Sequence, residues 1–380
     1  MKKLFTVGLL LPCLLSPGQD STEIKKQWEL AGYVKELGWV RSDHQFGNAR
    51  VTGLLHNRIL VKWKPGSAFT GRIELRNRIY WGEDVRQAPD FSKLLDNPDE
   101  AIDLSASWWK SRSVTAHTAI DRLWLEYRRP GWNLRAGRQR INWGLLNTWN
   151  PNDLFNSYSF LDFDYEERPG ADAVKWQYLP SDRSSLEWAV AATGSRPIVG
   201  AKYAINSDGY DLQINAGLYQ HTFTAGFGWA GHIGEAGFKG ELQYYAGRHS
   251  AYAQWLFSAE GDYMFENGYY LAAALLYNQK GADGPLLNPE QLNFQASPRS
   301  LMPAKWNLLT QAAKEFTPRF SGRLHLVYSP GPDLLILFPS LSYNLKTNWD
   351  LDFVWQSFFA RTHGFGAISH NAYLRLKRSF

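Results

Sequence analysis

The sequence predicts an all-β protein, a single closed antiparallel transmembrane β-barrel of about 18 strands, with 16 strands as the alternative count. Long segments alternate polar and apolar residues, and the segments are joined by connections rich in Gly, Pro, Asn and Asp. Aromatic residues make up 15% of the chain, yet no apolar run of about 18 residues follows the first 15 or so. A secreted β-sandwich or β-propeller is the competing fold class. The predicted strands are 28–40, 51–64, 69–82, 117–129, 132–143, 171–180, 184–194, 198–206, 210–219, 221–232, 236–246, 254–266, 269–279, 305–316, 320–329, 333–345, 349–361 and 368–380.

The first residues have the pattern of an export signal. Lys2 and Lys3 precede an apolar stretch from Leu4 to Leu15, and small residues follow at 16–18. This stretch is too short to span a bilayer and has the flanks of a secretory signal peptide. We therefore expect residues 1–18 to be a signal peptide and residues 19–380 to form the barrel.

Cysteine content and charge exclude several classes of function. Cys13 is the only cysteine, so the exported chain has none, which excludes disulfides, thiolate catalysis and cysteine-based metal sites. Loss of Lys2 and Lys3 takes the formal net charge from +5 to +3. A nearly neutral chain is not expected to bind nucleic acid.

The alternation is clearest in the third predicted strand, from Thr70 to Trp81. Apolar side chains occupy one face of this strand and charged side chains the other. Charges in a dry core are costly, so the charged face must meet water while the apolar face is buried or meets lipid. The apolar set is Ile73, Leu75, Ile79 and Trp81, and the charged set is Arg72, Glu74, Arg76 and Arg78.

The lengths of the connections give the topology. The three long connections, 83–116, 144–170 and 280–304, all follow odd-numbered strands, and every connection after an even-numbered strand is short. Bacterial outer-membrane barrels have short periplasmic turns and longer outer loops, so we expect an integral outer-membrane protein of a Gram-negative bacterium. The terminal Phe380 resembles the signal by which such barrels engage the barrel-assembly machinery.

Charged residues on the water-facing side of the early strands are predicted to line the pore. They would form an electropositive ladder that concentrates anionic or polar solutes, or a network of Arg–Glu pairs that keeps the barrel rigid, or both. The parity of the fifth strand changes along its length, which predicts a β-bulge near Gly137. The predicted pore-lining set is Arg58, Lys62, Arg72, Glu74, Arg76, Arg78, Arg122, Glu126, Arg128, Arg138 and Arg140.

The connection 144–170 is the candidate constriction. It follows Gly137-Arg138-Gln139-Arg140-Ile141-Asn142-Trp143-Gly144 and carries an Asn-Pro turn and an acidic stretch. This "GRQRINWG…WNPNDLF" region resembles porin-like barrels of the alginate-export and phosphate-selective-porin superfamily. The resemblance implies a passive channel or exporter, without naming a solute. In porins the third outer loop commonly folds into the lumen, so an inward-folded third outer loop is favoured here over an ordinary surface loop with a solvated charge cluster. The candidate constriction residues are Trp143, Trp149, Asn150, Asp153, Asp162, Asp164, Glu166 and Glu167.

No motif predicts catalysis, a cofactor or a metal. The nine histidines are scattered, and neither HExxH nor GxSxG occurs. Acids in 83–116 lack EF-hand spacing, so a solvated loop with a short helix near 91–104 is favoured over a Ca²⁺ site. The expected partners are outer-membrane lipid and small hydrophilic solutes that pass by passive diffusion, and a homo-oligomer is left open. The alternative function is a non-conducting receptor or scaffold in envelope or capsule assembly, with loops 83–116 and 280–304 as its binding surface.

Overall fold

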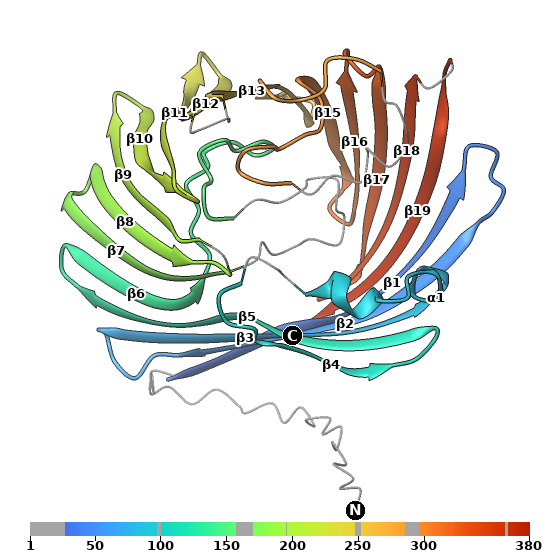
Figure 1. Ribbon diagram of the computed structural model, residues 1–380, viewed down its shortest axis with the longest axis horizontal. Coiled ribbons are helices and arrows are strands. Elements are labelled where there is room, and N and C mark those ends of the chain that lie inside the picture. Colours follow the sequence, from blue (N-terminus) through green and yellow to red (C-terminus); the bar gives the residue numbers. More distant parts are fainter. Residues whose placement is uncertain are drawn as a thin grey trace, which may run out of the picture.

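The computed structural model describes residues 27–96, 100–156, 170–194, 196–247, 252–285, 296–361 and 364–380. The predicted signal peptide, 1–18, lies outside the described residues. Nineteen strands are described, all in one antiparallel sheet, and eighteen of them close into a ring (Figure 1). The predicted 18-stranded barrel is therefore confirmed. None of the helices in the described ranges is long and apolar enough to cross a membrane.

The strands of the ring agree with the predicted segments to within a few residues. A short helix, α1 (Glu83–Gln87), and a 3₁₀ helix, η1 (Phe91–Leu95), follow β3, where the sequence predicted one helix near 91–104. The strands are β1 (Trp28–Asp43), β2 (Arg50–Trp63), β3 (Phe69–Gly82), β4 (Ser105–Lys110), β5 (Val114–Arg129), β6 (Trp132–Gln139), β7 (Ala171–Ser181), β8 (Ser184–Ala192), β9 (Ile198–Ser207), β10 (Tyr210–Tyr219), β11 (Thr222–Ile233), β12 (Ala236–Tyr245), β13 (Gln254–Met264), β14 (Tyr269–Asn278), β15 (Trp306–Thr317), β16 (Phe320–Ser329), β17 (Leu334–Lys346), β18 (Trp349–Arg361) and β19 (Phe365–Ser379).

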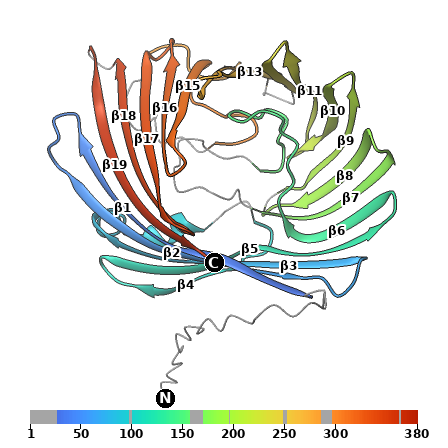
Figure 2. The same ribbon diagram turned by 180° about the vertical axis from the view of Figure 1, so that it is seen from behind.

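The ring closes between the first and last strands. β1 pairs with β19 from Tyr33 opposite Ser379 to Asp43 opposite Ser369, and the two strands lie side by side in Figure 2. Phe380 exchanges both backbone hydrogen bonds with Gly32, each 2.9 Å long. Closure leaves no sheet edge in the ring, so the backbone groups of the wall are paired inside the apolar layer of a membrane.

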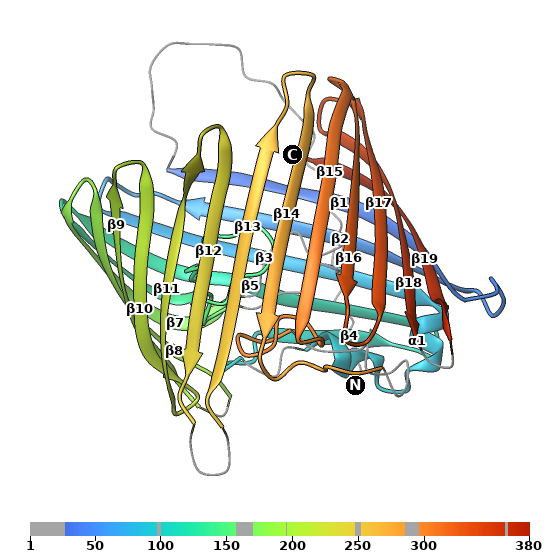
Figure 3. The same ribbon diagram turned by 90° about the horizontal axis from the view of Figure 1, so that it is seen from above.

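The two ends of the barrel differ as predicted. Short turns join the strands at one end, whereas α1 and the described part of the connection from β14 to β15 lie at the other end (Figure 3). Asp208 and Gly209 show why the short turns form, because both have positive φ (52° and 83°) and link β9 to β10 in two residues. Asp-Gly is a favoured pair for such a turn, whose twist matches that of the strands.

The outer face of the ring is apolar and is bordered by aromatic rings. Ile73 on β3, Leu125 on β5 and Leu374 on β19 are all exposed at this face. Near the short turns, Phe69 lies 4.8 Å from Tyr127 between ring centroids. A band of apolar side chains with a rim of aromatic rings is the surface that a bilayer requires.

Two features near β5 differ from the prediction. β6 ends at Gln139 instead of continuing to residue 143, and it pairs without interruption through Gly137, so the predicted bulge near Gly137 was wrong. The irregularity lies in β5, where Asp121 is the extra residue between Arg122, opposite Glu74, and Ile120, opposite Leu75. This extra residue changes the parity of β5, which a reading of β6 alone could not detect.

β4 was not predicted and lies outside the ring. It pairs with β5 from Ser105 opposite Ala119 to Lys110 opposite Thr115. β6 pairs with the same side of β5 only from Leu123 to Arg129. β4 therefore takes the part of the β5 edge that β6 leaves unpaired when its chain turns away after Gln139.

Candidate functional site in the barrel lumen

Charged side chains of β2, β3 and β5 form a buried network on the inner wall. Arg58 donates to Glu74 through Nε at 3.0 Å and contacts Asp121 through Nη1 at 2.9 Å. Arg76 reaches the other oxygen of Asp121 at 3.1 Å, and Arg72 pairs with Glu74. Only 5% of Arg58 is exposed. These contacts cross three strands, so the network fixes the wall as well as giving it charge.

A second pair of arginines shares Glu126 on β5. Arg135 donates to its Oε2 at 2.9 Å, and Arg128 contacts its Oε1 at 2.8 Å. The two networks hold five arginines and three carboxylates, and Arg78 of β3 adds a sixth arginine. This part of the wall, called the basic column below, therefore carries excess positive charge. The arginines are Arg58, Arg72, Arg76, Arg78, Arg128 and Arg135, and the carboxylates are Glu74, Asp121 and Glu126.

Arg78 lies further along β3 toward the long connections. Its guanidinium contacts the Tyr80 hydroxyl at 3.1 Å, the Leu95 carbonyl at 3.4 Å and His117 Nδ1 at 3.3 Å. His117 in turn lies 3.3 Å from Asp96, and it is fully buried. The segment after α1 therefore packs onto the basic column from inside.

Two of the remaining predicted pore-lining residues border this column, since Lys62 is opposite Arg72 and Arg122 is opposite Glu74, and the other two lie beyond it. Lys62 is near the short turns, 3.7 Å from Glu29, and Arg122 is buried with its Nη1 donating to the Asp121 carbonyl at 2.8 Å. Arg140 is exposed where the chain leaves β6. Arg138 is only 2% exposed and lies in a joint between β5, β6 and β7.

Contacts of Arg138, called the Arg138 joint below, hold the second half of the connection 83–116 against the wall. Arg138 contacts Asp172 at 2.8 Å and Glu100 at 2.8 Å, and it donates to the carbonyls of Ile120 and Ile102. Burial raises the pKa of the Glu100 carboxyl, and the nearby guanidinium opposes this shift. The guanidinium thus supplies hydrogen-bond donors to backbone carbonyls of β5 and of the segment that leads to β4, near the end of β6.

Replacing Arg138 with alanine is expected to release the segment around β4. The substitution leaves Asp172 and Glu100 without their guanidinium partner, and breaking a buried pair destabilises by about 3–5 kcal/mol. Limited trypsin digestion of the folded barrel should then cut after Lys110 or Arg112 much faster than in the parent. Arg140→Ala is the control, since Arg140 is exposed, and equal digestion rates of the two variants would contradict the role of the joint.

Residues 140–156 fold into the barrel and pack against its inner wall. In Figure 1 this coil lies inside the ring, beside β9 to β13. Trp143, Trp149 and Leu154 are buried, and the Trp143 ring meets Phe155 edge to face at 4.9 Å. Asn150 fixes the bend by accepting a hydrogen bond from the Leu146 amide at 2.9 Å. The inward fold predicted for the third outer loop is confirmed for this part.

Carboxylates on the wall that faces the basic column bind this coil by accepting hydrogen bonds from its backbone and side-chain N–H groups. Glu241 on β12 accepts from the amides of Leu145 and Asn152, the latter at 2.8 Å. Glu260 on β13 accepts from the amides of Asn147 and Thr148 at 3.1 and 3.2 Å. Two further wall residues bind Trp143: Glu187 accepts from its indole Nε1, and Gln213 donates to its carbonyl at 2.6 Å.

Glycines on the inner face of the wall make room for the coil. A Cβ at Gly200 would lie 2.7 Å from the Trp143 ring, and a Cβ at Gly228 would lie 2.9 Å from Asn152 Nδ2. Real Cβ atoms essentially never approach so closely. The wall is therefore shaped for the inserted coil at β9 and β11.

Parts of the other two long connections also pack against the inner wall. Asp84 of α1 accepts from the Trp39 indole at 2.8 Å, and Val85 packs on Tyr80 and Leu54. In the connection to β15, the side-chain amide of Asn278 donates through Nδ2 to the Met302 carbonyl at 3.0 Å. Both segments lie at the same end of the barrel (Figure 3).

The predicted constriction residues fall into two groups. Trp143, Trp149, Asn150 and Asp153 lie in the inserted coil, whereas Asp162, Asp164, Glu166 and Glu167 lie outside the described residues. The wall residues Glu187, Glu241 and Glu260 were missed. Their signal in the sequence is an acid at an inward position of a strand that otherwise carries few charges.

Comparison with known proteins identifies the fold. No family model matches the sequence, and no curated protein matches it. Among solved structures, OccK11 (OpdR) of Pseudomonas aeruginosa has a TM-score of 0.55 at 12% identity, covering 93% of this chain and 96% of that chain. OccAB1 of Acinetobacter baumannii and OccK5 (OpdH) of P. aeruginosa each have a TM-score of 0.58 at 9% identity. Each covers 93% of this chain, with 97% and 99% of their own chains matched. With its closed 18-stranded ring and apolar outer band, the chain is a porin-like β-barrel integral to the outer membrane.

Proposed function

We propose that the protein is an outer-membrane channel that passes small hydrophilic solutes by passive diffusion and favours anions. The observation that carries the proposal is the arrangement of charge across the lumen. Arginines outnumber carboxylates on the wall of β2, β3, β5 and β6, and an inserted coil faces them from the wall of β8 to β13. A positive wall in a confined passage raises the local concentration of anions.

The proposed filter has two parts. The side chains of Arg72, Arg76 and Arg78 provide the positive potential, and the coil of residues 140–156 limits the width. Solutes pass down their gradient, without a cofactor and without a covalent step. Residues 1–18 are proposed to direct export, and the resemblance to alginate-export and phosphate-selective porins stays a prediction.

Charge selectivity tests the proposal. For the refolded barrel in a planar bilayer with an about tenfold KCl gradient, the reversal potential should indicate anion preference. Replacing both Arg72 and Arg76 with glutamine should lower the anion-to-cation permeability ratio about two- to fivefold, because a unit charge 4 Å from an ion in water contributes about 1 kcal/mol. Arg183→Gln with Arg319→Gln, both on short turns, is the control. A ratio that is the same in all three proteins would contradict the positive filter.

The alternative function is a non-conducting receptor or scaffold in envelope assembly. That function would need the loops 83–116 and 280–304 as a docking surface. Part of each loop packs against the inner wall, through Val85 in the first and Met302 in the second, which favours the channel. Absence of conductance from a barrel shown by circular dichroism to be folded would favour the scaffold.

A further inference from the structure

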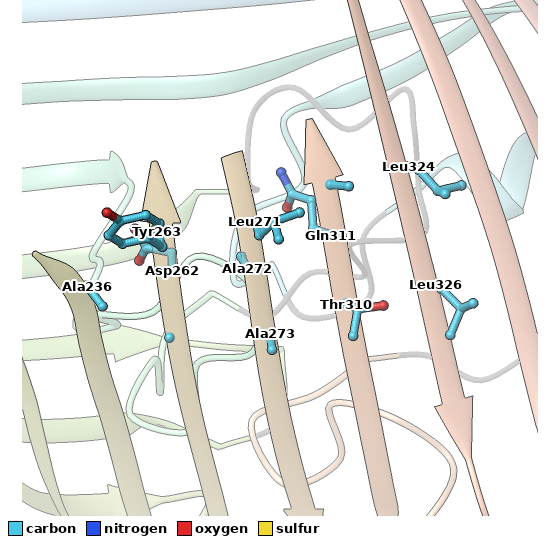
Figure 4. A pocket seen from close by; sticks show the side chains of 12 residues that line it. Ala236, Asp262, Tyr263, Leu271, Ala272, Ala273, Thr310, Gln311, Leu324 and Leu326 are labelled. Atoms are coloured by element: carbon cyan, nitrogen blue, oxygen red, sulfur yellow. The ribbon is translucent and has the colours of Figure 1, made fainter. Parts of the chain in front are cut away.

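The outer wall carries an apolar hollow over β13 to β16. Its volume is about 560 Å³, and Figure 4 shows its lining side chains. Two outward-facing rows of residues cross these four strands in register. The first row is Gly261, Ala273, Thr310 and Leu326, and the second is Tyr263, Leu271, Ala312 and Leu324. Small residues form the floor and larger apolar residues form the sides, so the hollow follows from side-chain size at outward positions.

The hollow lies beside the membrane interface on the side of the short turns. Tyr263 donates its hydroxyl to Glu235, in the turn between β11 and β12, at 3.0 Å. Two residues beyond Ala312 in β15, Lys314 places its Nζ 3.9 Å from the centre of the Tyr269 ring. Tyrosine and lysine side chains at such positions mark the depth of the lipid headgroups.

We propose that this hollow and Lys314 form a binding site for an anionic phospholipid of the periplasmic leaflet. One acyl chain fills the hollow, and the phosphate lies at the Lys314 ammonium. Charge complementarity selects this occupant, because the lining of the hollow is mainly apolar and a cation stands at its headgroup end. The site lies on the outside of the wall and is independent of the proposed channel function.

Packing explains why one acyl chain would stay bound in the hollow instead of exchanging freely with the surrounding bilayer. In a membrane no hydrophobic gain accompanies the transfer of a chain from lipid to protein, so contact area decides. An unfilled hollow loses dispersion contacts with its lining, and a flexible acyl chain can restore them. The ammonium adds an attraction worth about fivefold in affinity for an anionic headgroup near the surface.

The test measures binding of phosphatidylglycerol to the full barrel in detergent micelles by native mass spectrometry. Filling the hollow with Ala273→Leu and Ala312→Leu should remove most of the bound lipid. Lys314→Gln should weaken binding about fivefold. The matched controls are Ala216→Leu, an outward position on β10, and Lys346→Gln, a lysine over the Trp349 ring at the same end, and both should bind like the parent.

Three results would overturn the proposal. One is lipid binding that is unchanged when the hollow is filled, which would place the lipid elsewhere. Another is a parent barrel that is oligomeric and becomes monomeric when the hollow is filled, which would make this face an interface between copies. Inorganic phosphate added as a competitor should leave lipid binding unchanged, because the acyl chain is part of the proposed site. Displacement by phosphate would reduce the site to an anion contact and also overturn it.

Discussion

Replacing Glu241 with alanine is expected to raise the single-channel conductance and make it noisy. Glu241 is fully buried and accepts backbone hydrogen bonds from Leu145 and Asn152, which hold the inserted coil on the wall. Removing the acceptor leaves two buried backbone amides unpaired, at about 1–3 kcal/mol each, so the variant loses much of the attachment of this part of the coil. Planar-bilayer recordings of the refolded variant would measure the change.

Two further variants make this test specific. Glu241→Gln keeps one acceptor oxygen and should give an intermediate conductance. Asp352→Asn changes a buried wall carboxylate that bonds Ser342 and Arg375, away from the coil, and should conduct like the parent. If Glu241→Ala also conducts like the parent, the coil does not limit the passage.

Replacing Arg58 with alanine is expected to destabilise the barrel more than any other single change in the basic column. The substitution leaves Glu74 and Asp121 buried after the loss of a shared guanidinium. Glu74 keeps Arg72 and Asp121 keeps Arg76, so the expected loss is that of the hydrogen bonds between charged groups, about 1.5–3 kcal/mol each. The free energy of unfolding, measured by urea titration of the barrel in lipid vesicles, would report the loss.

Arg128→Ala is the matched control for this prediction. Arg128 also pairs with a wall carboxylate, Glu126, but 64% of its side chain is exposed. Exposed ion pairs contribute about 0–1 kcal/mol, so this variant should unfold close to the parent. A loss of stability at Arg58 no larger than at Arg128 would show that the network serves charge alone.

The strand pattern by itself determined the barrel. In β3, Ile73 and Trp81 face outward while Arg72 and Arg76 face inward, because a strand alternates its side chains and a one-residue slip would place charge in lipid. Turn residues such as Asp208 and Gly209 fixed the short connections, since few residues other than Asn, Asp and Gly adopt positive φ readily. Both signals are local, so the sequence carries them directly.

Only the tertiary structure determined which segments occupy the lumen and which pack along the strands of the wall. The contacts of Glu241 with Leu145 and of Arg138 with Glu100 join residues far apart in the chain, and no spacing rule relates them. The extra residue at Asp121, the place of β4 on the β5 edge and the hollow between Ala273 and Ala312 also depend on register across strands. The sequence specifies each strand through its own periodicity, whereas contacts across the lumen form only once the ring has closed.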